Sequence, residues 1–435
     1  FRAYFKRMKR TIFSALILGI LVFFAIWGLI NFYFVPLIFK TTENVGYAGS
    51  YTAQTIPDEI IDQISYGLTR IESDGTIKPA AAESYRVDKD RIYTFKIKKG
   101  QYFHNGEELT ASNLNIDFKD VQKKIIDTYT VEYTLKNPYS PFLSSVSSPI
   151  ITKDLSGLGK YKVREIDING GFVRAITLEE KNNKKNKRKI FFYPSQRALK
   201  IAFMLGEVDI AYNLNSTKVD ETDIAKWRNV TSSKHSDFSS LVVIFYNNAD
   251  SVLSNKKIRQ SLNYALPDNL PFGQRASGPI SPNSKYYNVP QSYKTSNIEL
   301  SKELLSSIDD EIATLVIQTP EEFLESAEYL HKEWKKIGIK TEIKTVDNVP
   351  TNFQLFVYRV TLPSDPDQYI LWHSGQPSNM IHYKNLRIDK LLEDGRSITD
   401  IVKRKEIYAD FQKYLVDDAP AAFYYYPTVY TLFKN

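Results

Sequence analysis

The stretch from Thr11 to Phe39 carries no charged side chain, and it places the strongest limit on the architecture of this chain. At 1.5 Å per residue, a helix of this length exceeds the roughly 30 Å hydrocarbon core of a bilayer. The residues just before the stretch are basic: Arg2, Lys6, Arg7, Lys9 and Arg10. By the positive-inside rule, they keep the N-terminal side in the cytoplasm. The pattern predicts a cytoplasmic basic tail over 1–10, a transmembrane helix over 11–39 and an extracytoplasmic domain after Lys40.

A cleaved signal peptide is the other interpretation of this stretch, because Gly46 and Ala48 weakly resemble a small-residue cleavage site. The apolar core of a signal peptide spans only about 7 to 15 residues, however. The length therefore favours an uncleaved anchor in the cell membrane.

The net charge of +7 is concentrated in the N-terminal segment. Residues 1–40 hold six basic and no acidic side chains, which leaves 51 basic against 50 acidic side chains in the rest of the chain. A nucleic-acid-binding domain normally carries a clear basic excess, so we expect no nucleic-acid partner.

The chain contains no cysteine, which excludes a disulfide framework, thiolate metal sites and a lipid-modified cysteine. The histidines lack the close pairing typical of a metal site: His104, His235, His331, His373 and His382. The sequence also contains no nucleophile elbow and no phosphate-binding loop. We therefore expect no metal, no cofactor and no enzymatic activity.

The clearest supersecondary unit lies between residues 313 and 346. A short apolar strand, "ATLVIQT", precedes a helix that should begin with Thr319 as N-cap, Pro320 in the first turn and Glu322 in a capping box. The buried face of this helix is predicted to comprise Phe323, Ala327, Leu330, Trp334 and Ile337. A second strand, "IKTEIKTV", follows. This succession predicts a right-handed parallel crossover, and hence an α/β fold.

Three further patterns predict local elements in the first half of the chain. Asp74 and Gly75 mark a β-hairpin, and the segment 91–97 alternates like a half-buried strand. Thr110 or Ser112 is placed to cap a short helix.

The segment from Ser195 to Gly206 is predicted to form a helix that these two residues delimit. Before it lies the basic run "KNNKKNKRK", residues 181–189, between two strand-like segments. The run could bind an anionic partner or form a solvated hairpin loop. The loop is the favoured interpretation, because short runs of like charge are usually solvated.

The segment "LPSDPDQYILWHSG", residues 362–375, combines carboxylates with aromatic side chains. Asp365 and Asp367 flank Pro366, which favours a turn bonded to its own backbone over a catalytic acid and base on opposite sides of a substrate. A chain of 435 residues should form two or three subdomains, and no long linker separates them. We therefore expect lobes that touch and enclose a cleft.

Several segments, in order along the chain, resemble the bacterial extracellular solute-binding proteins of the oligopeptide and dipeptide type, family 5, which serve ABC importers. "GLTRIESDGTIKPAAAESY" and "KKGQYFHNGEELTA" resemble its early signature, and "MLGEVDI" resembles its middle element. "FYNNADSVLSNKKIRQSLNYAL" resembles its central strand and helix, "RASGPISP" a later turn, and "DDAPAAFYYYP" its C-terminal strand. The similarity runs from about Gly46 to Tyr426.

The resemblance implies a two-lobed periplasmic-binding-protein (Venus-flytrap) fold of class α/β, with an extra subdomain on the first lobe. The implied boundaries are 41–246 plus 419–435 for the first lobe, about 58–145 for the extra subdomain and 247–418 for the second lobe. The implied function is that a monomer captures a peptide or similar extended solute and passes it to the permease subunits of an ABC transporter. The residues implied at the cleft are Tyr47, Tyr246, Asn247, Arg359, Leu362, Asp365, Trp372 and Tyr425.

The chain departs from the family pattern at one position that matters for recognition. In the family, an aspartate three residues before the "DP" pair holds the α-amino group of the peptide. This position is Leu362 here, and the family's preceding tryptophan position is Arg359. A free amino terminus is therefore not the expected handle, and Arg359 favours a ligand carboxylate. The alternative function is a sensory or scaffold protein of the envelope that retains the fold without transport.

Overall fold

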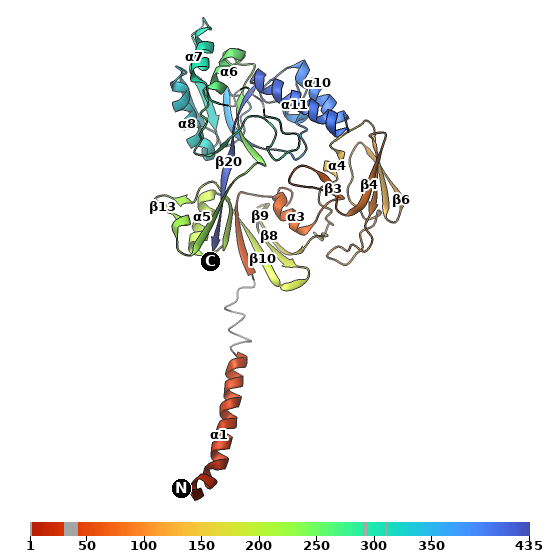
Figure 1. Ribbon diagram of the computed structural model, residues 1–435, viewed down its shortest axis with the longest axis vertical. Helices are drawn as coiled ribbons and strands as arrows, with labels where there is room; N and C mark the ends of the chain where they lie inside the picture. Colours follow the sequence, from red (N-terminus) through yellow and green to blue (C-terminus); the bar gives the residue numbers. More distant parts are fainter. Residues whose placement is uncertain (1, 30–41, 290–291, 293–294, 310) are drawn as a thin grey trace. The chain divides into compact units, whose positions relative to one another are not determined.

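The structure, a computed structural model, describes residues 2–29, 42–289, 292, 295–309 and 311–435. The chain divides into two compact units, each with its own strands and helices (Figure 1). Unit 1 comprises Phe1–Thr55, Tyr161–Tyr212 and Lys434. Unit 2 comprises Ile56–Lys160, Asn213–Phe433 and Asn435.

The N-terminal helix α1 spans Arg2–Leu29. Within the described residues, no helix is both long and apolar enough to cross a bilayer. The predicted transmembrane helix over 11–39 therefore receives no support here, and its part from residue 30 onward lies outside the described residues.

Unit 1 is built on strands in the order β11-β1-β10-β9-β8. The strands are β1 (Thr42–Ala48), β8 (Tyr161–Asn169), β9 (Phe172–Glu180), β10 (Asn183–Tyr193) and β11 (Ile210–Leu214). β1 is parallel to β10 and β11, whereas β8, β9 and β10 are antiparallel. Helix α5 (Gln196–Leu205) ends as predicted: the Ser195 hydroxyl accepts a hydrogen bond from the Ala198 amide at 3.1 Å, and Gly206 has a φ of +85°.

The first segment of unit 2, residues 56–160, carries an antiparallel sheet in the order β4-β5-β7-β6. Its elements are α3 (Asp58–Ile64), β2 (Thr69–Ile71), β3 (Ile77–Pro79), β4 (Ala82–Asp88), β5 (Ile92–Ile97), β6 (Val121–Asp127), β7 (Thr130–Leu135) and α4 (Phe142–Ser145). β2 and β3 form the hairpin predicted at Asp74 and Gly75. Tyr93 and Phe95 of β5 are buried in the core of this segment, which confirms the predicted strand.

The short helix predicted near Thr110 is wrong. Asn113 closes a turn there instead: its side-chain oxygen accepts from the Thr110 amide at 2.8 Å, and its side-chain nitrogen donates to the Glu108 carbonyl at 2.9 Å. Such local bonds offer the backbone an alternative to helical hydrogen bonds.

The rest of unit 2 is built on a sheet in the order β18-β17-β19-β15-β20, and β14 and β16 also pair with β20. The strands are β14 (Val230–Ser236), β15 (Ser240–Tyr246), β16 (Gly273–Arg275), β17 (Leu315–Thr319), β18 (Thr341–Thr345), β19 (Leu355–Thr361) and β20 (Ala421–Lys434). A minor pair, β12 (Lys218–Val219) and β13 (Thr222–Asp223), precedes the short 3-10 helix η2 (Ile224–Lys226). β17, β18 and β19 are mutually parallel, and β15 is antiparallel to both of its neighbours.

Helices cover both faces of this sheet. The helices are α6 (Lys256–Tyr264), α7 (Ile298–Ser306), α8 (Leu324–Lys335), α9 (Tyr369–Trp372), α10 (Leu386–Ser397) and α11 (Ile401–Asp418). Alternate residues of β15 enter two cores: Val242 and Ile244 pack with α6 and α8, whereas Val243 and Phe245 pack with α10 and α11. The result is a three-layered α/β/α arrangement.

The predicted parallel crossover is confirmed, since β17 leads through the 3-10 helix η3 (Glu321–Phe323) and α8 to β18. The predicted face of α8 is buried in one core. The predicted capping box is wrong, because Thr319 is still part of β17 and fully buried. Its hydroxyl lies 3.3 Å from the carbonyl oxygen of Val357 and cannot cap the helix.

Candidate ligand-binding site

The parallel strands of unit 2 end at a common edge, which we call the carboxyl edge: Thr319, Thr345 and Thr361. In open α/β sheets, ligands bind outside this edge of the strands. Arg359 lies near the end of β19, with a guanidinium nitrogen 3.8 Å from a carboxylate oxygen of Glu322. Both side chains are 47% exposed, so the ion pair is weak and Arg359 remains able to bind another carboxylate.

Leu362 follows β19 and enters the core. Its amide donates to the Ser239 carbonyl at 2.7 Å, and its side chain is only 7% exposed. The side chain at this position therefore contributes packing, and it presents no charge to the carboxyl edge.

Asp365 is held by a buried arginine from helix α11. Arg404 donates to its two carboxylate oxygens at 2.8 and 2.6 Å, and the Asp367 amide donates to it at 3.0 Å. Burial acts to lower the pKa of Arg404, but the hydrogen bonds and charge of Asp365 outweigh it and hold this pKa above its ordinary value. The predicted turn is confirmed. Both carboxylate oxygens of Asp365 accept hydrogen bonds within the fold, so this side chain serves as a structural anchor.

Asp367 and Trp372 are also bound within the fold. Asp367 accepts from Arg396 at 2.9 Å, while burial raises its pKa despite this partner. The Trp372 indole donates to the Gln368 side chain at 2.7 Å, and the residue is 3% exposed. These contacts commit the side chains of Asp367 and Trp372 to the fold itself.

Tyr425 and Tyr246 are buried as well. The Tyr425 hydroxyl lies 2.8 Å from the Ser326 hydroxyl, and burial raises the pKa of this phenol to about 12. The Tyr246 hydroxyl donates to the Asn263 side chain at 2.7 Å. In the sheet register, Tyr246 pairs with Leu355 at the start of β19, so it lies at the edge opposite to Thr361.

Asn247 follows Tyr246 at this opposite edge, and its side chain donates to the Phe353 carbonyl at 2.9 Å. Tyr47 belongs to unit 1, where its ring stacks on Tyr212 with centroids 5.2 Å apart and lies 6.3 Å from Phe192. The structure thus brings Arg359, Leu362, Asp365 and Tyr425 to the carboxyl edge, and it places Tyr246 and Asn247 away from it.

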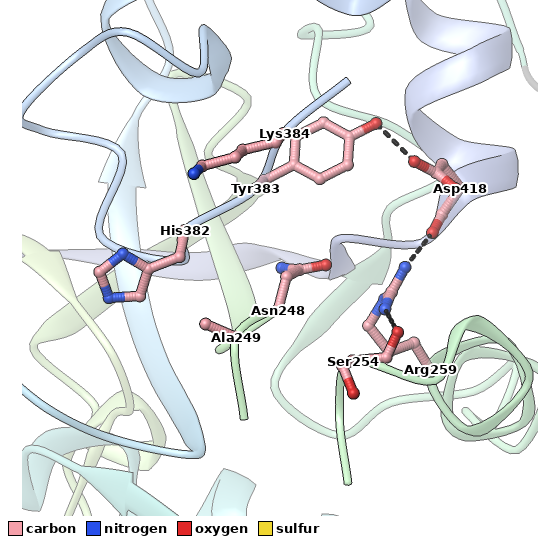
Figure 2. A pocket seen from close by; sticks show the side chains of 8 residues that line it. All are labelled: Asn248, Ala249, Ser254, Arg259, His382, Tyr383, Lys384 and Asp418. Carbon is pink, nitrogen blue, oxygen red and sulfur yellow. Dashed lines mark hydrogen bonds between the residues drawn. The ribbon is translucent and has the colours of Figure 1, made fainter. Parts of the chain in front are cut away.

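A polar hollow of about 520 Å³ also lies in unit 2 (Figure 2). Its lining residues are Asn248, Ala249, Ser254, Arg259, His382, Tyr383, Lys384 and Asp418. Arg259 is 5% exposed and donates to four backbone carbonyls. Two of these carbonyls, those of Asp418 and Ala419, lie at the C-terminal end of α11. Tyr383 donates to the Asp418 carboxylate at 2.7 Å.

No motif in the sequence indicated this hollow, because its residues come from separate segments. Arg259 is bound to backbone carbonyls, and the Asp418 carboxylate is bound by Tyr383, Asn385 and Lys256. Among the described residues, no group of three or more histidine, aspartate or glutamate side chains could hold a metal ion.

The chain is similar to known extracellular solute-binding proteins of bacteria. The family model of bacterial extracellular solute-binding proteins, family 5 Middle, matches residues 112–381. The oligopeptide-binding protein AppA of Bacillus subtilis is 25% identical, over 87% of this chain and 83% of AppA. The probable D,D-dipeptide-binding periplasmic protein DdpA of Escherichia coli is 22% identical, over 85% of this chain and 81% of its own.

Solved structures share the fold. The substrate-binding protein CtaP of Listeria monocytogenes matches with a TM-score of 0.76 and 24% identity, over 90% of this chain and 94% of its own. NikZ of Campylobacter jejuni, solved with Ni(L-His), matches with a TM-score of 0.75 and 19% identity, over 91% of this chain and 94% of its own. AppA of Bacillus subtilis, solved with a nonapeptide, matches with a TM-score of 0.69 and 23% identity, over 91% of this chain and 94% of its own. These relatives are binding proteins and not enzymes, as expected, and they confirm the periplasmic-binding-protein fold.

Proposed function

Because the chain belongs to the bacterial extracellular solute-binding proteins of family 5, we propose that it captures peptides or similar extended solutes for an ABC importer. The observation that carries this proposal is the likeness to AppA, which matches over 91% of this chain and was solved with a bound nonapeptide. The proposed partners are the solute and the permease subunits of the importer, and the proposed active form is a monomer. Binding would proceed by closure of two lobes on the solute.

The proposed lobes are 41–246 with 419–435, and 247–418, with the extra subdomain at about 58–145. In this proposal, the carboxyl edge of unit 2 provides one side of the site, and Arg359 receives a carboxylate of the solute. The carboxyl edge is supported by the packing and hydrogen bonds of four side chains in the fold: Leu362, Asp365, Trp372 and Tyr425. An indirect role is proposed for Tyr47, Tyr246 and Asn247: their ring contacts and hydrogen bonds hold the backbone of their own segments in place.

Calorimetric titration of the full chain against peptides tests the proposal. We expect binding of peptides with a free C-terminus, and about tenfold weaker binding after Arg359→Gln, because a hydrogen bond to a charged group is lost. Amidated peptides should bind equally to both proteins. Glu322→Gln, which removes the competing carboxylate, is the matched control and should not weaken binding.

Two results would count against the proposal in different ways. A folded protein that binds none of the peptides would contradict the function itself. Peptide binding that Arg359→Gln leaves unchanged would contradict only the role of Arg359.

Attachment to the membrane is a separate part of the proposal. It is supported by the uncharged stretch from Thr11 to Phe39 alone, since the described helices add nothing to it. Alkaline carbonate extraction of membranes from cells that produce the full chain tests it. The chain should stay in the membrane pellet, and complete release into the supernatant would contradict an anchor.

A further inference from the structure

The hairpin of β9 and β10 carries a dense positive charge at its turn and in the first half of β10. Residues 181–187 are all exposed. The run 181–189 contains six basic and no acidic side chains: Lys181, Lys184, Lys185, Lys187, Arg188 and Lys189. In the described part of the chain, Lys184, Lys185 and Lys187 have no acidic group within salt-bridge distance. We call residues 181–187 the basic hairpin.

Among the described residues, the nearby acidic groups do not pair with Lys184, Lys185 or Lys187. Glu43 pairs with Arg188 at 2.6 Å, further along β10. Glu179 pairs with Arg164 at 3.4 Å. Glu180 accepts a hydrogen bond from Asn186 at 2.8 Å.

The sheet register places the basic hairpin where the N-terminal segment joins the fold. β1 begins at Thr42, and Thr42 lies beside Lys187 in the parallel pair of β1 and β10 (Figure 1). Phe39, the last residue of the uncharged stretch, is three residues before Thr42. Three residues of chain span at most about 10 Å. A membrane that holds this stretch would therefore lie within reach of the basic hairpin.

We propose that the basic hairpin binds a bilayer surface that contains anionic phospholipids, and so holds unit 1 against the membrane at the point where the chain leaves it. This proposal rests on the membrane attachment within the proposed function. The attraction of a lysine to an anionic surface decays within roughly 10 Å at moderate salt, which matches the short connection to Thr42. Each lysine at such a surface strengthens binding roughly fivefold.

The absence of cysteine makes a direct test possible. Asn183→Cys places a single donor fluorophore in the hairpin, and the full chain is reconstituted in vesicles with acceptor-labelled headgroups. Energy transfer should be higher in vesicles of phosphatidylcholine with phosphatidylglycerol than in phosphatidylcholine alone, and added salt should lower it. The triple variant Lys184→Gln, Lys185→Gln, Lys187→Gln should abolish the difference between the lipids.

The matched control removes three exposed lysines at or near helix α8 in unit 2: Lys332→Gln, Lys335→Gln and Lys340→Gln. It should leave the energy transfer unchanged. Equal transfer in both lipids, or a lipid dependence that survives the hairpin triple variant, would overturn the proposal.

Two further readouts separate this proposal from the proposed function. Flotation with phosphatidylcholine vesicles measures the anchor, and peptide titration measures solute binding. Flotation only with phosphatidylglycerol, dependent on the three hairpin lysines, would support the hairpin and contradict the anchor. Flotation with neither lipid would overturn both. Loss of peptide binding alone would leave the basic hairpin unaffected.

Discussion

Buried ion pairs decide what individual acidic residues can do in this protein. The side chains of Arg404 and Asp365 are 3% and 11% exposed, and they form a bidentate pair. Such a pair is costly to break, because the remaining charge would be buried without a partner. Arg359 is the contrasting case, since its only acidic partner in the described chain is the exposed Glu322. The exposed arginine is therefore the better candidate for contact with a solute.

Tyr383 and Asp418 allow a prediction about pH. Burial acts to raise the pKa of Asp418, but hydrogen bonds from Tyr383 and Asn385, together with Lys256, outweigh it and hold this pKa below its usual range. A lowered carboxyl pKa contributes stability that is present above the unfolded pKa and is lost as the pH falls through the folded pKa. Tyr383→Phe should lower the free energy of unfolding by about 1.5–3 kcal/mol at neutral pH.

This loss should shrink as the pH falls below about 4, because Asp418 then becomes protonated first in the unfolded chain and, at still lower pH, in the folded protein. Urea unfolding of both proteins at neutral and acidic pH measures the difference. Tyr414→Phe is the control, because the Tyr414 hydroxyl has no hydrogen bond within the described residues. This substitution should change the free energy of unfolding little at either pH. A loss of the same size at both pH values would contradict the role of the carboxylate.

Helix α5 depends on a glycine in the strand beneath it. A Cβ atom at Gly46 of β1 would lie 2.3 Å from Leu199 of α5 and 3.3 Å from Val208. Gly46→Ala should therefore lower the free energy of unfolding by about 1–3 kcal/mol, because the core has no room for the methyl group. Urea unfolding measures the loss.

The double variant Gly46→Ala, Leu199→Ala provides the control for this contact. Leu199→Ala alone removes a buried side chain and should cost about 2–5 kcal/mol. The double variant should lose less than the sum of the single variants, because the shortened side chain makes room for the methyl group. Strict additivity would show that the two residues do not compete for the same space.

At the scale of the whole molecule, unit 2 joins segments that are far apart in the chain. The Ser140 amide donates to the Arg396 carbonyl at 2.7 Å, and the Thr399 hydroxyl donates to Asp90 at 2.5 Å. The Arg396 guanidinium lies 5.2 Å from the ring centre of Tyr139. These contacts fasten the segment 56–160 to helix α10 and to the turn between α10 and α11.

Arg396→Ala should loosen this junction. Loss of the cation–π contact with Tyr139, about 1 kcal/mol, and of the ion pair with Asp367 should speed hydrogen exchange of the Ser140 amide at least roughly fivefold. Lys390→Ala, which breaks an exposed pair with Asp394 on the same helix, should leave the exchange unchanged. The same exchange rate in Arg396→Ala and the unmodified chain would contradict a role of this side chain in the junction.

Much of the fold could be predicted from local patterns. The parallel crossover, the ends of α5 and the strand at 92–97 follow from periodicity and capping residues, which act over a few positions. The family similarity was visible in the order of several short motifs. The predicted capping box failed because Thr319 lies in a buried strand, where its hydroxyl has a cross-strand partner.

The sequence by itself determined the α/β class, the family and the segment at which a solute site was expected. Only the tertiary structure decided the role of each polar or aromatic side chain in that segment. Asp365 meets Arg404 from 39 residues away, and Trp372 and Tyr425 are buried by elements distant in the chain. Burial and long-range partners arise only when the layers pack, so no local pattern could separate the structural anchor Asp365 from the exposed Arg359.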